Sequence, residues 1–220
     1  MQRYRALKTM LLLPGALALL LQPAAAAGRG QVVAGLKTGL NLADFVGNDA
    51  DPGAGSTKAQ KAGFAIGGYV IFPVNRYFKV QPEFLISGKG AVYKSSVLGV
   101  HYESRIKLTY LEIPVLARFD IESRSGAKPA ILVGPSFGIK LSAQSESRAI
   151  GSSSTDTAEN IKTLDPGIVL GGVVEIPAGA GAFSLEARYT RSLVTISEST
   201  GGRTPDIRNS VISIMLGYRF

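Results

Sequence analysis

The residues best suited to acid–base or nucleophilic chemistry lie together in the segment VHYESR, where His101, Glu103 and Ser104 offer a base, an acid and a hydroxyl. A catalytic triad depends on convergence in space, which closeness along the chain does not provide. We therefore interpret His101 as an exposed loop residue and expect no catalytic site. A barrel enzyme that acts on lipids is the alternative that these residues leave open.

No segment carries the spacing of a metal or cofactor site. DADPG, residues 49–53, contains two carboxylates, but the other ligands of a calcium loop are missing, and we interpret it as a polar turn. No glycine-rich phosphate loop precedes a helix. The chain has no Cys, which excludes disulfides, thiolate zinc sites, a cysteine nucleophile and a lipid anchor on cysteine. We expect no metal and no cofactor.

Charged residues instead occur at every second position of apolar stretches. Strict alternation with a period of two indicates a strand with one apolar and one polar face. Such a strand fits either a soluble antiparallel sheet or a transmembrane barrel whose apolar face meets lipid. In residues 78–90 the two faces are Phe78, Val80, Pro82, Phe84 and Ile86 against Lys79, Gln81, Glu83, Ser87 and Lys89.

The same alternation recurs along the chain, separated by connections that are alternately long and short. It predicts an all-β fold, an eight-stranded antiparallel up-and-down transmembrane β-barrel. Long connections come first and last, so both termini lie at the end with short turns, which is periplasmic in such barrels. The expected strands are residues 31–42, 63–74, 78–90, 108–119, 130–141, 167–176, 183–190 and 211–220.

The cost of burying charge decides which solvent each face meets. A charge on the lipid face costs roughly 2–4 kcal/mol near the bilayer midplane, whereas charges inside a narrow barrel can pair with one another. A soluble lipocalin-like binding barrel would reverse the two faces. An interior of eight strands is just wide enough for side chains, so we expect no open pore. The expected lumen charge network is Lys79, Glu83, Glu112, Arg118, Glu186 and Arg188.

The N-terminus predicts export. A basic segment, the 12-residue apolar run MLLLPGALALLL and QPAAAAG form a signal peptide, residues 1–27, with cleavage near Ala26 or Ala27. An N-terminal membrane anchor is the alternative, but the run is too short to span a bilayer. Residues 28–220 then form the outer-membrane barrel domain. The partners expected are outer-membrane lipid and the barrel assembly machinery, for which Tyr218 and Phe220 at the end of the last strand form the assembly signal.

The charge balance points to no nucleic-acid partner. Removal of Arg3, Arg5 and Lys8 with the signal peptide lowers the formal net charge from +8 to +5. The remaining cations are scattered among strands and loops without a basic cluster or an aromatic stacking surface. No second apolar stretch reaches the length of a transmembrane helix.

Three prolines conflict with the barrel pattern. Pro82, Pro114 and Pro135 fall inside expected strands, where each lacks the N–H that a closed ladder uses. A closed barrel has no edge strand on which to place them. We expect local β-bulges at these positions.

Several motifs resemble the PorT-like outer-membrane β-barrel family, which is typical of Bacteroidota. The resemblance rests on QPEFLISGKG at 81–90 and YLEIPV at 110–115, with support from GLKTGLN, GFAIGGY, GP and the final GYRF. It covers essentially the whole mature chain and implies an eight-stranded outer-membrane barrel. The family's best-known member assists a secretion and gliding system. The resemblance implies little beyond the barrel, and from it we carry over assistance to a secretion system only as one candidate role. Because no residues specify a reaction, we expect a non-enzymatic structural, surface-interaction or secretion-accessory role, with a surface or secretion-system protein as a further partner.

Overall fold

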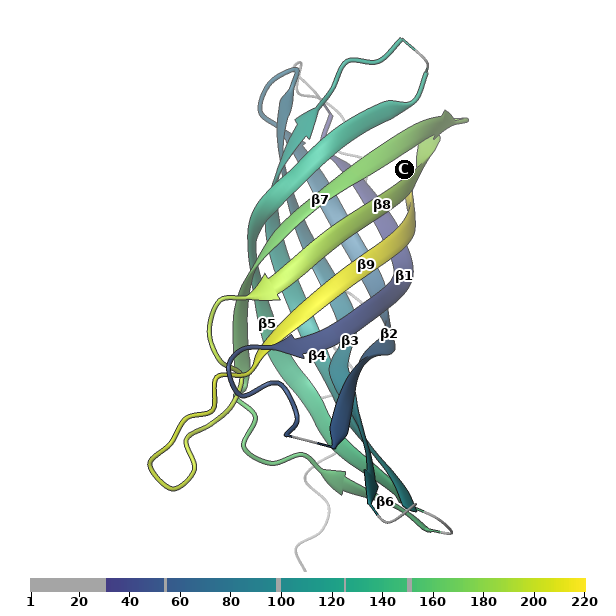
Figure 1. The fold of residues 1–220 in the computed structure, drawn as a ribbon. Coiled ribbons are helices and arrows are strands. Elements are labelled where there is room, and N and C mark those ends of the chain that lie inside the picture. Colours follow the sequence, from purple (N-terminus) through teal and green to yellow (C-terminus); the bar gives the residue numbers. More distant parts are fainter. Residues whose placement is uncertain (1–30, 54, 98–99, 125, 150–151) are drawn as a thin grey trace, which may run out of the picture.

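The computed structural model describes residues 31–53, 55–97, 100–124, 126–149 and 152–220 (Figure 1). The predicted signal peptide lies outside the described residues. Among those described, no helix is long and apolar enough to cross a membrane. The strands are β1 (Val33–Val46), β2 (Ser56–Pro73), β3 (Phe78–Val97), β4 (Val100–Asp120), β5 (Lys128–Ala149), β6 (Ser152–Thr157), β7 (Leu164–Ala178), β8 (Gly181–Ser192) and β9 (Arg208–Arg219).

Eight of these strands close into a ring. Their order is β4-β3-β2-β1-β9-β8-β7-β5, and β4 also pairs with β5, which completes the circle. All of the pairings are antiparallel, and each ring strand lies beside its neighbours along the chain. β6 pairs with β5 outside the ring, at the bottom of Figure 1. The predicted eight-stranded antiparallel barrel is confirmed.

The outer wall of the ring is apolar. Leu40 is 70% exposed and Phe183 is 60% exposed, while Glu83 and Arg188 on the inner side are buried. The predicted face assignment is therefore confirmed, and a lipocalin-like barrel with an apolar interior is ruled out. Aromatic pairs lie at the short-turn end of the wall, where barrels carry a girdle: Phe78–Phe119 at 5.2 Å and Phe183–Tyr218 at 5.0 Å between ring centroids.

Four strands continue beyond the apolar band at the long-loop end. β2 to β5 contain 18 to 22 residues, whereas β1 and β7 to β9 contain 12 to 15. The sequence predicted loops here, so the long connections after residues 90 and 141 are corrected to paired strands. We call this part the extension; it comprises residues 56–61, 91–97, 100–107, 142–149 and 152–157 and lies at the bottom of Figure 1.

The turns at the opposite end are short and tightly bonded. Asn75 closes the β2–β3 turn by accepting hydrogen bonds at its Oδ1 from the backbone N–H groups of Tyr77 (2.9 Å) and Phe78 (2.8 Å). In the β7–β8 turn Gly179 has φ = 60°, a conformation that favours glycine. Both chain ends of the described barrel lie at this end, since β1 begins there and β9 ends there (Figure 1).

The expectation of bulges at the three prolines is wrong. Pairing is interrupted beside each proline and resumes in the same register, as between Tyr69↔Glu83 and Phe72↔Val80 next to Pro82. The register shifts of the described strands lie elsewhere, between Gln60 and Ala65 of β2 and at Thr109/Tyr110 of β4. The ladder therefore absorbs each proline as missing hydrogen bonds rather than as an extra residue.

The interior is not polar throughout. A buried apolar cluster caps the long-loop end. A second cluster lines the wall formed by β4, β5 and β7. The cap consists of Phe45, Ala50, Ala91, Leu108, Tyr110, Ala143 and Ile196, and the wall cluster of Leu116, Ala130, Leu132, Val169 and Val173.

Candidate functional site

Lys37 is the centre of the first ion-paired group inside the barrel. Its Nζ lies 2.7 Å from Oε1 of Glu83 on β3 and 2.7 Å from Oε2 of Glu186 on β8. Arg188 contacts Glu83 at 2.8 Å and Glu186 at 3.5 Å. All four side chains are at most 5% exposed. Because each carboxylate contacts two cations, no charge in this group is left unpaired.

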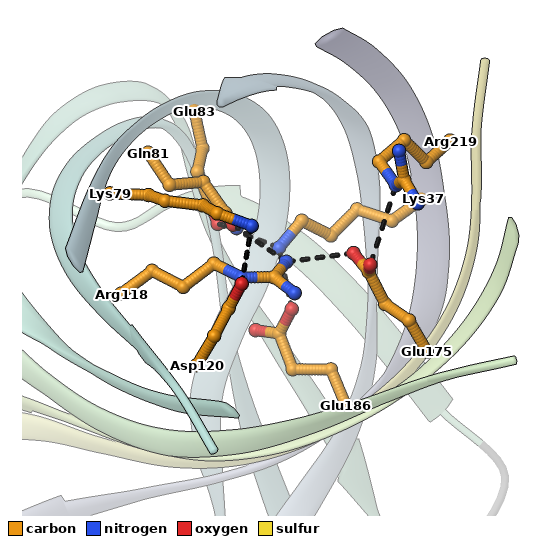
Figure 2. Close-up of polar contacts among 9 residues, drawn as sticks. All are labelled: Lys37, Lys79, Gln81, Glu83, Arg118, Asp120, Glu175, Glu186 and Arg219. Atoms are coloured by element: carbon orange, nitrogen blue, oxygen red, sulfur yellow. Dashed lines mark hydrogen bonds and ion pairs between the residues drawn. The ribbon is translucent and has the colours of Figure 1, made fainter. Parts of the chain in front are cut away.

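A second group lies toward the short-turn end around Arg118. Its Nη1 is 2.7 Å from Oε1 of Glu175, and its Nε is 2.7 Å from Oδ1 of Asp120. Lys79 also pairs with Asp120, and Arg219 contacts Oε2 of Glu175 at 3.3 Å. Figure 2 shows these side chains meeting from opposite walls of the ring. The pairs therefore cross the lumen and fill it.

A third group lies toward the apolar cap. Lys89 Nζ is 2.5 Å from Oε1 of Glu112 and 3.0 Å from Oδ2 of Asp165. Asn209 Nδ2 donates a hydrogen bond of 2.8 Å to the same oxygen of Asp165. The Lys89 ammonium also lies 4.9 Å from the ring centroid of Tyr110, where a cation–π interaction adds to the ion pairs.

Two amides fill the spaces between and beside the ionic groups. Gln81 donates a hydrogen bond of 2.8 Å to Glu83 of the first group and accepts a long one of 3.5 Å from Arg118 of the second. Asn41 Nδ2 donates to Ser87 Oγ at 3.0 Å, while its Oδ1 accepts from Ser213 at 2.8 Å. These contacts tie β1, β3 and β9 together through the interior.

The three groups are electrically balanced only when taken together. The first has equal numbers of the two signs, the second has one cation in excess, and the third has one carboxylate in excess. In total six cations face six carboxylates, and each forms an ion pair with at least one group of opposite sign. This arrangement neutralises the lumen and offers no free base or nucleophile among these twelve residues. They are Lys37, Lys79, Lys89, Arg118, Arg188 and Arg219 with Glu83, Glu112, Asp120, Asp165, Glu175 and Glu186.

All six residues named from the sequence point inward, but they do not meet as one cluster. Glu83, Glu186 and Arg188 share the first group, and Arg118 and Lys79 share the second through Asp120. Glu112 is paired with Lys89, which was not among the six. The expected charge network of these six residues is therefore replaced by three groups at successive depths.

Sequence reasoning left out half of the ionic residues. Alternation could have identified three of them, because a polar position of an expected strand is occupied by each of Lys37, Lys89 and Glu175. Alternation could not have identified Asp165, because β7 begins at Leu164, whereas the strand was predicted to begin at residue 167. The residues missed are Lys37, Lys89, Asp120, Asp165, Glu175 and Arg219.

The last residues lie on the outer wall. Tyr218 packs between Phe183 and Phe220, with ring centroids at 5.0 and 5.6 Å. The backbone N–H of Phe220 donates a 2.9 Å hydrogen bond to the carbonyl of Ala34 on the first strand. Their part in assembly remains a prediction.

The candidate catalytic and calcium residues lie in the long-loop region. His101 is exposed at the start of β4, and Glu103 pairs with Arg105. Asp49 pairs with Arg203, and Asp51 lies 2.7 Å from Lys58. The two carboxylates of the 49–53 turn are thus each bound to a different cation. Within the described residues no three His, Cys, Asp or Glu side chains gather as metal ligands would.

The sequence matches the family described as "Outer membrane protein beta-barrel domain" over residues 22–198. No curated protein matches it.

Among solved structures, one that is similar is the attachment invasion locus protein Ail of Yersinia pestis, in complex with the heparin analogue sucrose octasulfate. It is 14% identical with a TM-score of 0.42, and the match covers 87% of this chain and 100% of that chain. Neisserial surface protein A is 14% identical with a TM-score of 0.44, covering 84% and 95%. OprG of Pseudomonas aeruginosa is 11% identical with a TM-score of 0.47, covering 86% and 94%.

Proposed function

This chain belongs to the outer membrane protein beta-barrel domain family, and we propose that it is a sealed, non-enzymatic barrel whose extension serves as an interaction surface outside the cell. Its place is the bacterial outer membrane. The observation that carries the proposal is the extension itself, where β2 to β5 stay paired beyond the lipid-facing band instead of ending in loops. Paired strands hold side chains in fixed positions, as a binding surface requires.

Sealing is supported by the three ion-paired groups. Paired side chains cross the lumen at successive depths, and eight strands leave room for little else. Planar-bilayer recordings of the purified protein are expected to show no steady ohmic current. A stable current that grows in proportion to salt would overturn the sealed barrel and assign a channel.

The surface role is tested on intact cells by photo-cross-linking. A photoreactive residue at Tyr102, exposed in the extension, is expected to cross-link to a specific protein that mass spectrometry identifies. The matched position is Ile131, exposed on the lipid-facing wall, which is expected to yield lipid adducts alone. Removal of β6 should abolish the protein cross-link while the barrel keeps its heat-modifiable gel mobility. Equal patterns at the two positions would refute a surface role.

A secretion-accessory role is the second candidate, through membership of the PorT-like branch. The two motifs that carry that resemblance lie side by side, since Leu85 pairs with Glu112 and Ser87 with Tyr110. Their inward side chains, including Glu83 and Lys89, belong to the ionic groups. Deletion of the gene should then reduce protein secretion. Normal secretion in the deletion strain would refute the secretion-accessory role, and the surface role would then be the one that stands.

We also propose that residues 1–27 are removed on export and that Tyr218 and Phe220 mark the chain for the assembly machinery. Mass spectrometry of the mature N-terminus is expected to find cleavage near Ala26 or Ala27. Deletion of Phe220 should lower the amount of assembled barrel, while deletion of Gly53 in the first long loop should not. Cleavage elsewhere, or equal assembly of the two variants, would refute the respective proposal.

A further inference from the structure

A basic groove lies on the outer wall of the extension. Its volume is about 370 Å³, its charged lining comprises Lys61, Lys94, Glu103, Arg105 and Lys107, and the buried Val92 also lines it. These residues come from β2, β3 and β4, three consecutive strands of the ring. Strand pairing places Val92 opposite Arg105 and Lys94 opposite Glu103. The groove is thus built on the paired part of the extension.

Cations outnumber acids in this groove. Arg105 pairs with Glu103, and Lys107 pairs with Glu146 of β5. Lys94 lies 3.9 Å from Glu103, which Arg105 already occupies. None of the ion pairs formed by the described residues includes Lys61. The four cations of the lining therefore share Glu103 and the neighbouring Glu146, unlike the interior, where the two signs are equal in number.

Lys61 is partly buried and lies near other positive charges. Partial burial and the neighbouring charges of Lys107 and Arg105 hold its pKa below the ordinary value, although Glu146 acts in the opposite sense. Its ammonium makes one long hydrogen bond of 3.4 Å, to the carbonyl of Ala62. An anion in the groove would relieve this repulsion.

The position of the groove relative to the membrane indicates which kind of anion it can bind. Arg105 and Lys107 lie on the same side of β4 as the lipid-facing Val115 and Phe119, because β4 keeps one register with β3 from Val100 to Phe119. The shift at Thr109/Tyr110 affects the pairing of β4 with β5. Leu111 is the last apolar residue on that side, and Lys107 follows four residues beyond it. At about 3.4 Å per residue on a tilted strand, Lys107 stands roughly 10 Å above Leu111, in the headgroup layer.

We propose that this groove binds the phosphate-bearing headgroup of an outer-leaflet lipid, whose acyl chains lie on the apolar wall directly below. The groove opens on the outer wall just above the apolar band, so a lipid can place its phosphate against Lys61 and Arg105 while its chains stay in the membrane. Guanidinium and ammonium groups are the side chains that recognise phosphate. This inference needs the outer-membrane location and not the proposed surface role.

The test uses the purified mature barrel in a neutral detergent. Its probes are a bis-phosphorylated lipid A, the same lipid with both phosphates removed, and inorganic phosphate, with binding followed by native mass spectrometry and thermophoresis. The phosphorylated lipid is expected to bind, and its affinity to fall as salt rises. Equal binding of the dephosphorylated lipid would overturn the proposal. Inorganic phosphate that binds as tightly as the lipid would show a free-anion site and overturn the lipid assignment.

Charge variants locate the site. Lys61→Gln and Arg105→Gln are each expected to weaken lipid binding about fivefold, which corresponds to the roughly 1 kcal/mol that one basic residue contributes near an anionic membrane surface. Glu103→Gln removes an acid and is expected to strengthen binding by a similar factor, a gain that misfolding cannot imitate. Arg191→Gln, an exposed cation on β8, is the control and should bind like the wild type. Unchanged binding in the three groove variants would overturn the site.

Discussion

The interior of the barrel and the groove on its outer wall use the same residue types in opposite ways. Inside, each of the twelve ionic side chains has a partner of opposite sign, and the two signs are equal in number. Four cations line the groove with one carboxylate, Glu103, and the neighbouring Glu146 of β5 pairs with Lys107. A buried charge without a partner costs several kcal/mol, whereas water and counterions screen an exposed one. Cations and carboxylates must therefore match in number where solvent is excluded, whereas an exposed site can carry an excess of one sign.

The largest effect is expected from Glu83→Gln. Glu83 is fully buried and contacts both Lys37 and Arg188, so the change deprives two buried cations of a partner at once. We expect the free energy of unfolding to fall by about 3–5 kcal/mol, measured by urea titration of the reconstituted barrel. Glu198→Gln, exposed in a long loop, is the control.

A double variant sharpens this prediction. In Glu83→Gln the two cations Lys37 and Arg188 are left to share Glu186. Adding Lys37→Met removes one of them and should recover part of the loss, as a double-mutant cycle measures. Equal stability of Glu83→Gln and Glu198→Gln would show that the interior is hydrated and that its balance has no energetic basis.

Phe84→Arg tests the other side of the same strand. Phe84 is 59% exposed on the lipid-facing wall, next to the inward Glu83. An arginine there meets hydrocarbon and should cost roughly 2–4 kcal/mol, seen as a loss of inserted, heat-modifiable protein. Tyr102→Arg in the extension meets water and is expected to insert normally. Similar behaviour of the two variants would mean that the apolar band has been placed wrongly.

A smaller loss is expected from Glu112→Gln. Lys89 loses one carboxylate but keeps Asp165 at 3.0 Å, so its charge stays paired. We expect a cost of about 1–3 kcal/mol, typical of a lost charged hydrogen bond, as a lowered thermal midpoint. Glu112→Gln should therefore destabilise less than Glu83→Gln. The reverse order would indicate that partner number does not govern the interior.

The smallest effect concerns pH in the extension. The hydrogen bond from Lys107 holds the pKa of Glu146 below its ordinary value. A depressed pKa stabilises the folded extension above the ordinary glutamate range, and this contribution is lost as the pH falls through the lowered value. Hydrogen-exchange protection of the paired ends of β4 and β5 should decline over that acidic interval. Glu146→Gln should abolish the decline, and a decline that survives it would assign the effect to another group.

The sequence was sufficient for the membrane part of the fold because each strand there separates two solvents. Leu40, Phe84 and Leu185 meet lipid while Glu83 and Glu186 face inward, and this contrast is what a period of two records. In β6 of the extension every residue is exposed, so both faces meet water. The serine-rich strand β6 therefore has no alternating signal, and the sequence indicated a loop where the structure has a strand.

The interior pairs could not be derived from alternation alone. Alternation assigns a side chain to the lumen, but its partner depends on the register of strands across the ring. Lys37 lies two strands from both of its carboxylate partners, so their contact follows from closure and side-chain length. The prediction of bulges at the prolines was wrong for a related reason. The register is set by the whole strand and survives the loss of single hydrogen bonds.

Lys37 has a consequence for how the molecule is made. β1, which carries it, meets β9 at the seam between the first and last strands, and its partners Glu83 and Glu186 stand on opposite sides of that seam. In an open sheet the lysine could reach Glu83 but not Glu186, which would be separated from it by the whole unclosed edge. The ammonium contacts both carboxylates only when the ends of the chain have been joined. Completion of the circle and formation of the second ion pair are one event, so the pairing of Lys37 with Glu186 distinguishes a finished barrel from an unfinished one.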